Sequence, residues 1–231
     1  MMYKMTAIIA LTISFSAHAH DVWLEQKQDG LALIYGHVDE LVELEPEKVR
    51  AIRAYGVDGI ELSIDSHSGA GEMLVKPEKK AAMVTVEYDN GFWTKIDPTT
   101  WENKSKRHYE NHLDSSHSYK YNKNLMGWSN QFTQPSGLRM EIVPLENPLA
   151  VKAGGRVSLQ VLYQGSPLPD TALEVHGIDD TFRTDENGRV EVLLDSKRKF
   201  QHIAAYYRYE LPGNLDADEM SLTANLVFGA D

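Results

Sequence analysis

The chain has 231 residues, contains no cysteine and carries a formal net charge of −11. The lack of cysteine excludes disulfides, iron–sulfur clusters and thiolate-rich zinc sites, so any metal ligand must be a His, carboxylate, amine or thioether group. The negative charge argues against nucleic acids and anionic membrane surfaces as partners, because both attract basic patches.

Residues 1–19 have the features of a cleaved secretory signal peptide. Lys4 precedes a short apolar run, and Ala17 and Ala19 occupy the −3 and −1 positions of a small-residue cleavage site. That run is too short to cross a bilayer, and no second apolar run reaches 18 residues, so we expect no membrane insertion of the mature chain. An exported chain without disulfides is more usual of a bacterial periplasm, which is the location we expect.

Cleavage after Ala19 makes His20 the first residue of the mature protein and lowers the net charge from −11 to −12, because Lys4 is lost. An N-terminal His offers its free α-amine and an imidazole nitrogen to one metal ion as a chelate. The alternative interpretation is that His20 merely follows a convenient cleavage site.

The first expected element is a β-hairpin, because residues 20–27 and 31–37 alternate in polarity on either side of an Asp-Gly turn. A four-residue loop at 27–30 pairs His20 with His37. A two-residue loop at 29–30 pairs His20 with Asp39 and leaves His37 diagonal to it on the same face. Opposed Cβ atoms lie about 5 Å apart, so either loop brings the two imidazoles together. The alternative is that His37 ends a strand and points into solvent.

Four further strands are expected in the N-terminal half, at 49–55, 60–64, 82–88 and 92–96. The last two form a hairpin around Asn90-Gly91, which is a strong turn dipeptide. The acidic segment 38–47 is interpreted as a solvated loop, and His67 as a surface loop residue.

The segment 97–124 is polar, aromatic and rich in histidine. If residues 103–113 form a helix, His108 and His112 lie at positions i and i+4 on one face, a spacing that can hold a metal ion. The segment lacks the correctly placed Glu of a zinc-protease motif. The alternative is a mobile surface loop, so His108 and His112 are secondary metal-ligand candidates.

Asn147-Pro148 marks the expected domain boundary. The fold class we expect is all-β, with an N-terminal antiparallel β domain, 20–145, followed by an immunoglobulin-like β-sandwich, 146–231. Short alternating segments separated by Gly and Pro turns predict the sandwich strands at 157–163, 171–176, 200–209 and 222–228. His176 and His202 lie on or beside these strands and are assigned structural roles.

Short motifs follow one another along the mature chain: His20-Asp21-x-Trp23-Leu24-Glu25, Tyr35-Gly36-His37, Glu45-Pro46-x-x-Val49, Gly137-x-x-x-Glu141-Ile142-Val143-Pro144 with Asn147-Pro148, Val161-Leu162-Tyr163-x-Gly165-x-Pro167-Leu168, Thr184-Asp185-x-x-Gly188-Arg189 and a closing segment, 222–228. Each motif alone is weak, but together they cover nearly the whole mature chain. In this order the sequence resembles a bacterial periplasmic family first known as a domain of unknown function. Many members of that family are linked to nickel and cobalt uptake.

The resemblance implies a secreted all-β protein that binds a transition metal and hands it to an import system. It supports His20 and His37 as ligands, and no motif reaches the His-rich segment. The leading hypothesis is a periplasmic nickel- or cobalt-binding protein that supplies a membrane metal transporter and is not itself an enzyme. Imidazole and amine nitrogens also suit copper and zinc, so ligand type does not determine the ion.

Two other functions stay open from the sequence. An N-terminal His with a second His also forms the copper brace of oxidative polysaccharide-cleaving enzymes, although none of their other motifs is present. The other is a metal-free adhesion or binding module that uses the C-terminal sandwich to hold a protein or a glycan. No catalytic carboxylate pair, nucleophile–base set or cofactor-binding loop stands out.

Overall fold

The computed structural model describes residues 20–69 and 72–230. The expected signal peptide, residues 1–19, lies outside the described residues. Secondary structure in the described part is almost entirely β, which confirms the expected all-β class. Within these residues no helix has the length and apolar character needed to cross a membrane.

The N-terminal sheet has five antiparallel strands. They lie in the order β1–β2–β7–β6, and β3 also pairs with β2. Their bounds are β1 (Asp21–Lys27), β2 (Gly30–His37), β3 (Glu40–Val42), β6 (Ile64–Gly69) and β7 (Glu72–Pro77).

The central sheet has nine strands in the order β15–β14–β17–β18–β10–β8–β4–β5, with β9 also paired to β8. Strands β10 and β18 run parallel, whereas the other described strand pairs are antiparallel. Bounds are β4 (Val49–Tyr55), β5 (Glu61–Leu62), β8 (Met83–Lys95), β9 (Trp101–Glu102), β10 (Asp114–Leu125), β14 (Ala172–Val175), β15 (Thr181–Arg183), β17 (Phe200–Glu210) and β18 (Glu219–Gly229).

A C-terminal sheet of four strands completes the sandwich. It contains β11 (Met140–Pro144), β12 (Arg156–Tyr163), β13 (Ser166–Pro167) and β16 (Arg189–Leu193). Short 3-10 helices lie at Pro46–Lys48, Lys106–His108, Asn130–Thr133 and Pro148–Ala150.

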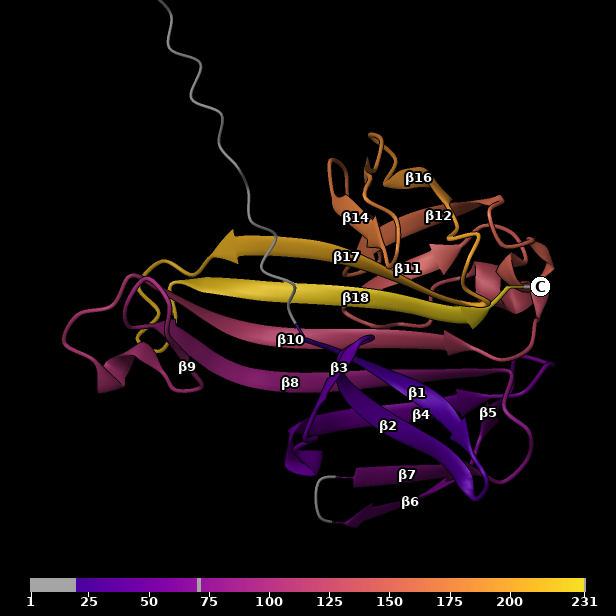
Figure 1. Cartoon of the computed structure of the whole chain (residues 1–231), viewed down its shortest axis with the longest axis horizontal. Helices are drawn as coiled ribbons and strands as arrows, with labels where there is room; N and C mark the ends of the chain where they lie inside the picture. Colours follow the sequence, from indigo (N-terminus) through magenta and orange to yellow (C-terminus); the bar gives the residue numbers. More distant parts are fainter. Residues whose placement is uncertain (1–19, 70–71, 231) are drawn as a thin grey trace, which may run out of the picture.

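The central sheet lies between the N-terminal and C-terminal sheets (Figure 1). Val84 and Val86 of β8 pack with Val22 and Leu24 of β1 in one hydrophobic core. Tyr121 of β10 packs with residues of β11 and β12 in the other core. Successive side chains of a strand point to opposite faces, so the central sheet can contribute to both cores.

One continuous sheet therefore crosses the expected boundary at residues 145 and 146. β10 lies before that boundary and pairs along its length with β18, which is the last strand of the chain. This long-range parallel pairing ties the two halves together and positions the C-terminal strands beside the N-terminal hairpin (Figure 1).

Two local expectations were wrong. Asn90-Gly91 is not a hairpin turn, because β8 continues through it to Lys95. The register of β8 with β10 shifts there, so that Gly91 pairs with Ser118 and Asp89 with Tyr119. The extra residue forms a β-bulge, and the positive φ of Gly91, +80°, supplies the bend.

The His-rich segment also differs from expectation. Residues 103–113 contain only the 3-10 helix Lys106–His108, capped by the Ser105 side chain, so His108 and His112 do not share a helical face. Residues 114–124 belong to the segment 97–124, for which a surface loop was one interpretation, and they form most of the largely buried strand β10. The segment 103–113 lacks an apolar stripe to bury, which is what most helices need for stability.

Candidate functional site

The first hairpin brings His20 and His37 together. Strand pairing runs from Lys27 with Gly30 to Asp21 with Gly36, and each pair of residue numbers sums to 57. This is the register that opposes His20 to His37. The turn that produces it has two residues, 28 and 29, instead of the four residues, 27–30, of the expected loop. The two imidazole centroids lie 4.6 Å apart with their planes at 50°.

Two tyrosine rings pack next to the His20–His37 pair. The ring of Tyr35 meets that of His20 edge-on, with centroids 5.4 Å apart, and packs against Tyr88 at 5.2 Å. The Tyr35 hydroxyl donates a 2.8 Å hydrogen bond to Oδ1 of Asn90, the bulge residue of β8. The β-bulge at Asn90, which we expected to be a turn, therefore fixes the position of the Tyr35 ring next to His20.

The surroundings lower the pKa of the His20 imidazole, which favours its neutral form. Burial lowers its pKa, and the nearby His37 and Lys120 lower it further, against smaller opposing effects of nearby carboxylates. Lys120 lies buried in β10, where its Nζ donates to Oγ1 of Thr223 at 3.0 Å. A neutral imidazole keeps a lone pair available for a metal ion.

A pocket of about 570 Å³ opens beside this pair, between the β2–β3 turn and strands β14 and β17. From the sequence we expected structural roles for His176 and His202. Both line this pocket together with His37. Antiparallel pairing places them next to each other, because the His176 backbone N–H donates to the His202 carbonyl at 2.9 Å. Only the pairing of β14 with β17 could have revealed this, and the sequence does not give that pairing.

Each of these two histidines faces a carboxylate. His176 Nε2 lies 3.4 Å from Asp39 Oδ2, and His202 Nε2 lies 3.9 Å from Asp21 Oδ2. The ring of Trp23 covers His202 with centroids 5.7 Å apart. Burial lowers the pKa of His202, Asp21 opposes that effect and the nearby His176 adds to it.

The other histidines of the described residues lie elsewhere. His108 is exposed in the 3-10 helix, and His67 is exposed on β6, 3.0 Å from Asp65. His117 contacts Asp89 at 2.8 Å. Among the described residues, no group of three or more His, Asp or Glu side chains converges closely enough to hold a metal ion.

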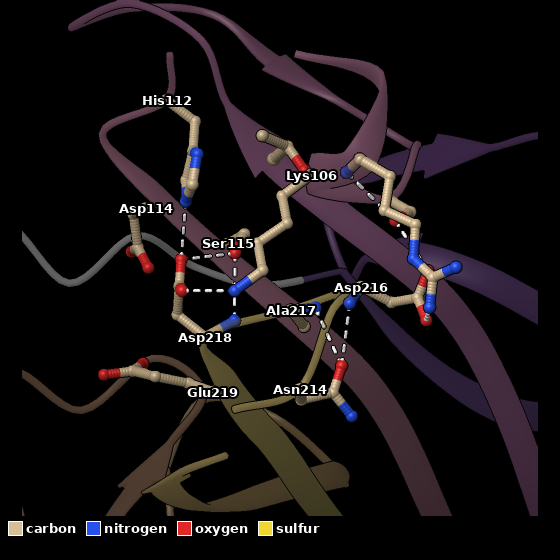
Figure 2. Close-up of polar contacts among 12 residues, drawn as sticks. Lys106, His112, Asp114, Ser115, Asn214, Asp216, Ala217, Asp218 and Glu219 are labelled. Carbon is tan, nitrogen blue, oxygen red and sulfur yellow. Dashed lines mark hydrogen bonds and ion pairs between the residues drawn. The ribbon is translucent and has the colours of Figure 1, made fainter. Parts of the chain in front are cut away.

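His112 belongs to a separate polar cluster at the start of β18, shown in Figure 2. Asp218 accepts hydrogen bonds from Lys106 Nζ at 2.6 Å and from Ser115 Oγ at 2.5 Å, and His112 Nε2 lies 2.7 Å from the same carboxylate. The hydrogen bonds from Lys106 and Ser115 lower the Asp218 pKa against the opposing effect of burial, and His112 lowers it further. The cluster fastens the 106–115 segment to β18.

This cluster is not a nucleophile–base set, although it contains Ser, His and Asp. The Ser115 hydroxyl and the His112 ring both contact Oδ2 of Asp218, as the dashed lines of Figure 2 show. An activated serine needs the imidazole itself as hydrogen-bond partner, with the carboxylate behind the imidazole. The arrangement therefore supports a structural role for Ser115 and Asp218.

Comparisons with known proteins place the chain in a family. The family model described as "Domain of unknown function (DUF4198)" matches residues 17–197. A protein of Haemophilus influenzae strain Rd, described as "Uncharacterized protein", is 27% identical over 229 residues, which cover 98% of this chain and 96% of that protein. The D0-D1 domain of intimin aligns with 88% of this chain and 93% of its own, at 14% identity and a TM-score of 0.24, a similarity too low to support a structural argument. Because the family model matches well over half of the sequence, the chain belongs to the DUF4198 family.

Proposed function

We propose that this protein binds a transition metal ion, nickel or cobalt, in the periplasm and supplies it to a membrane metal transporter. The observation that carries the proposal is the 4.6 Å separation of the His20 and His37 rings at the end of the first hairpin. Cleavage of the signal peptide after Ala19 would add the α-amine of His20, so that two imidazoles and one amine surround the ion.

The chemistry of these donors suits a borderline divalent cation. Imidazole and amine nitrogens bind nickel, cobalt, copper and zinc, whereas magnesium and calcium prefer oxygen ligands. The lowered pKa of His20 reduces proton competition for the ion near neutral pH. The negative charge of the chain, −11, favours the approach of cations.

An incomplete ligand shell is consistent with a carrier that must release its cargo. The described residues contain no preformed group of three or more side-chain ligands, so the His20–His37 pair would leave positions open. A receiving protein can enter an open position and take the ion by ligand exchange. A closed structural site has no such position, because its protein ligands complete the shell.

The decisive experiment compares two chains that differ only at the N-terminus. A chain that begins at His20 and one that begins at Ala19 carry the same imidazoles, but only the first has its α-amine on the chelating residue. We expect the Ala19 chain to bind nickel about 10-fold or more weakly in calorimetric titrations, since one donor is lost from the shell.

The His67→Ala variant is the matched control, because it removes an exposed histidine away from the pair and should leave the affinity unchanged. Equal affinities of the two chains would refute the α-amine chelate. The absence of micromolar binding of nickel, cobalt, copper or zinc would refute metal binding altogether and favour a binding module.

A further inference from the structure

The pocket beside the hairpin contains buried polar atoms without hydrogen-bond partners. The side chains of Asp21 and His202 are each more than nine-tenths buried and both line the pocket. Neither Asp21 Oδ1 nor His202 Nε2 makes a hydrogen bond to any described residue. Buried polar groups are almost always paired, so an unpaired acceptor beside an unpaired ring nitrogen indicates a missing partner.

The gap between these side chains is the size that a metal ion bridges. His202 Nε2 and Asp21 Oδ2 lie 3.9 Å apart, which is too long for a hydrogen bond. Metal bonds of about 2.0–2.2 Å to an imidazole nitrogen and a carboxylate oxygen together span up to about 4.2 Å. One ion can therefore contact both groups with only a small adjustment.

The same pocket contains a further His–Asp gap at its mouth. His176 Nε2 lies 3.4 Å from Asp39 Oδ2, and the His176 side chain is about one quarter exposed. The carboxylates that line the pocket include Glu174 and Asp179, and its lining contains no Lys or Arg. Arg198 contacts Asp39 from outside at 3.6 Å. The buried Lys120 lies near Asp21, but the lining carboxylates outnumber these two cationic groups, so the charge distribution favours a cation over an anion.

We propose that this pocket is a second transition-metal site, with Asp21 and His202 as its first two ligands and His176 as the third. Asp21 directly follows His20 in the extended chain, so its side chain points away from the His20 ring, and His37 borders both sites. It goes beyond the proposed function, since it needs neither the α-amine nor the imidazole of His20. The described residues do not form a preassembled three-ligand group, so rotation of His176 completes the shell when the ion enters.

The His20–His37 pair is partly exposed, whereas Asp21 and His202 are buried. Two such neighbouring sites would let an ion pass from the more exposed site to the buried one. The His20–His37 pair lies at the end of the hairpin, and His37 also lines the pocket. An ion captured by the outer pair therefore needs no long path to reach the buried pair. This proximity predicts two bound ions per chain at saturation.

The test is the stoichiometry of nickel binding measured by equilibrium dialysis. The chain that begins at His20 should bind two ions, and its His202→Gln variant should bind one. The chain that begins at Ala19 should lose affinity at the first site and keep the second. Removal of the partly exposed His176 by His176→Ala tests the same pocket without disturbing the buried core, and should weaken the second site about 10-fold or more.

The outcomes separate the two proposals. His67→Ala is again the control and should bind two ions. A wild-type stoichiometry of one, unchanged in His202→Gln and His176→Ala, would overturn the second site and leave the first intact. A third outcome is that the wild-type chain binds one ion, that His176→Ala loses it and that the chain beginning at Ala19 keeps it with the same affinity. That result would overturn the first site and support the site in the pocket.

Discussion

A buried ion pair between β10 and β11 gives the sharpest test of how the central sheet and the C-terminal sheet are joined. Lys123 Nζ donates to Glu141 Oε2 at 2.7 Å, and each side chain is only 1% exposed. The carboxylate also accepts hydrogen bonds from the backbone N–H and hydroxyl of Ser136 and from the Gly137 N–H. The central sheet and the C-terminal sheet are therefore linked by a fully desolvated charge pair.

The Lys123→Met substitution keeps the length of the side chain and removes its charge. The Glu141 carboxylate then stays buried without a counter-charge, which costs about 3–5 kcal/mol of stability. For a domain of this size each kcal/mol lowers the melting temperature by about 2–4 °C. We expect calorimetry at pH 7 to show a decrease of roughly 6–20 °C.

The pH dependence gives an internal check with a defined sign. Burial tends to raise the Glu141 pKa, but Lys123 and the Ser136 hydrogen bonds lower it below its usual range. Wild-type stability from Glu141 is therefore present above the unfolded-state pKa and is lost as the pH falls. In Lys123→Met burial dominates and raises the Glu141 pKa, so the variant gains stability on acidification. The difference between the two proteins should narrow from pH 7 towards pH 4.

The Lys123→Met/Glu141→Gln double variant separates charge from packing. The glutamine amide oxygen can still accept the Ser136 hydrogen bonds, and no net charge stays buried. We expect this variant to recover most of the lost stability. A double variant no more stable than Lys123→Met, or a single variant that melts within 2 °C of wild type, would refute the uncompensated-charge argument.

Two further predictions concern the hairpin and the Asp218 cluster. Gly36 has a φ of +140°, and a Cβ there would lie 2.5 Å from the Glu40 carbonyl oxygen, so Gly36→Ala should lower both the melting temperature and the nickel affinity. Gly137→Ala is the control. Gly137 has a φ of +87° and no atom within 4 Å of a Cβ, so this variant should lower only the melting temperature. Asp218→Asn should cost on the order of 1 kcal/mol at pH 7, because the carboxylate is 43% exposed, and clearly less at pH 3. The sign follows from its pKa, which the hydrogen bond from Lys106 lowers, so that its stabilisation is lost as the pH falls; an equal cost at both pH values in thermal melts would contradict this assignment.

The features that the sequence predicted correctly depend on local patterns. Alternation on both sides of residues 28–30 was enough to predict the first hairpin, and the observed register that opposes His20 to His37 is one of the two that the pattern left open. The strands at 49–55 and 200–209 were also located within a residue, because their polarity pattern and flanking turns are local signals.

The features that it missed depend on long-range pairing or on buried polar residues. Strand β10 was not recognised because Lys120, Asn122 and Lys123 make it look solvated, yet all three are buried. The role of His176 and His202 depends on where β14 and β17 lie relative to β1, which no local pattern specifies. Asn90-Gly91 is a strong hairpin signal, but the positive φ of Gly91 also suits a bulge, and the pairing with β10 selects the bulge.

The central sheet buries several polar residues on β10 and β18. Asn122 and Asn225 pair across β10 and β18, and their side-chain amides make no hydrogen bond to the described residues. Lys120 is fully buried on the same strand, and Asp21 lies close enough to influence its pKa. Apolar residues of similar size would stabilise this interface more, because buried polar groups cost free energy unless they are paired. Asp21 and His202 are buried polar residues that line the pocket, as we expect if the proposed second metal site forms there.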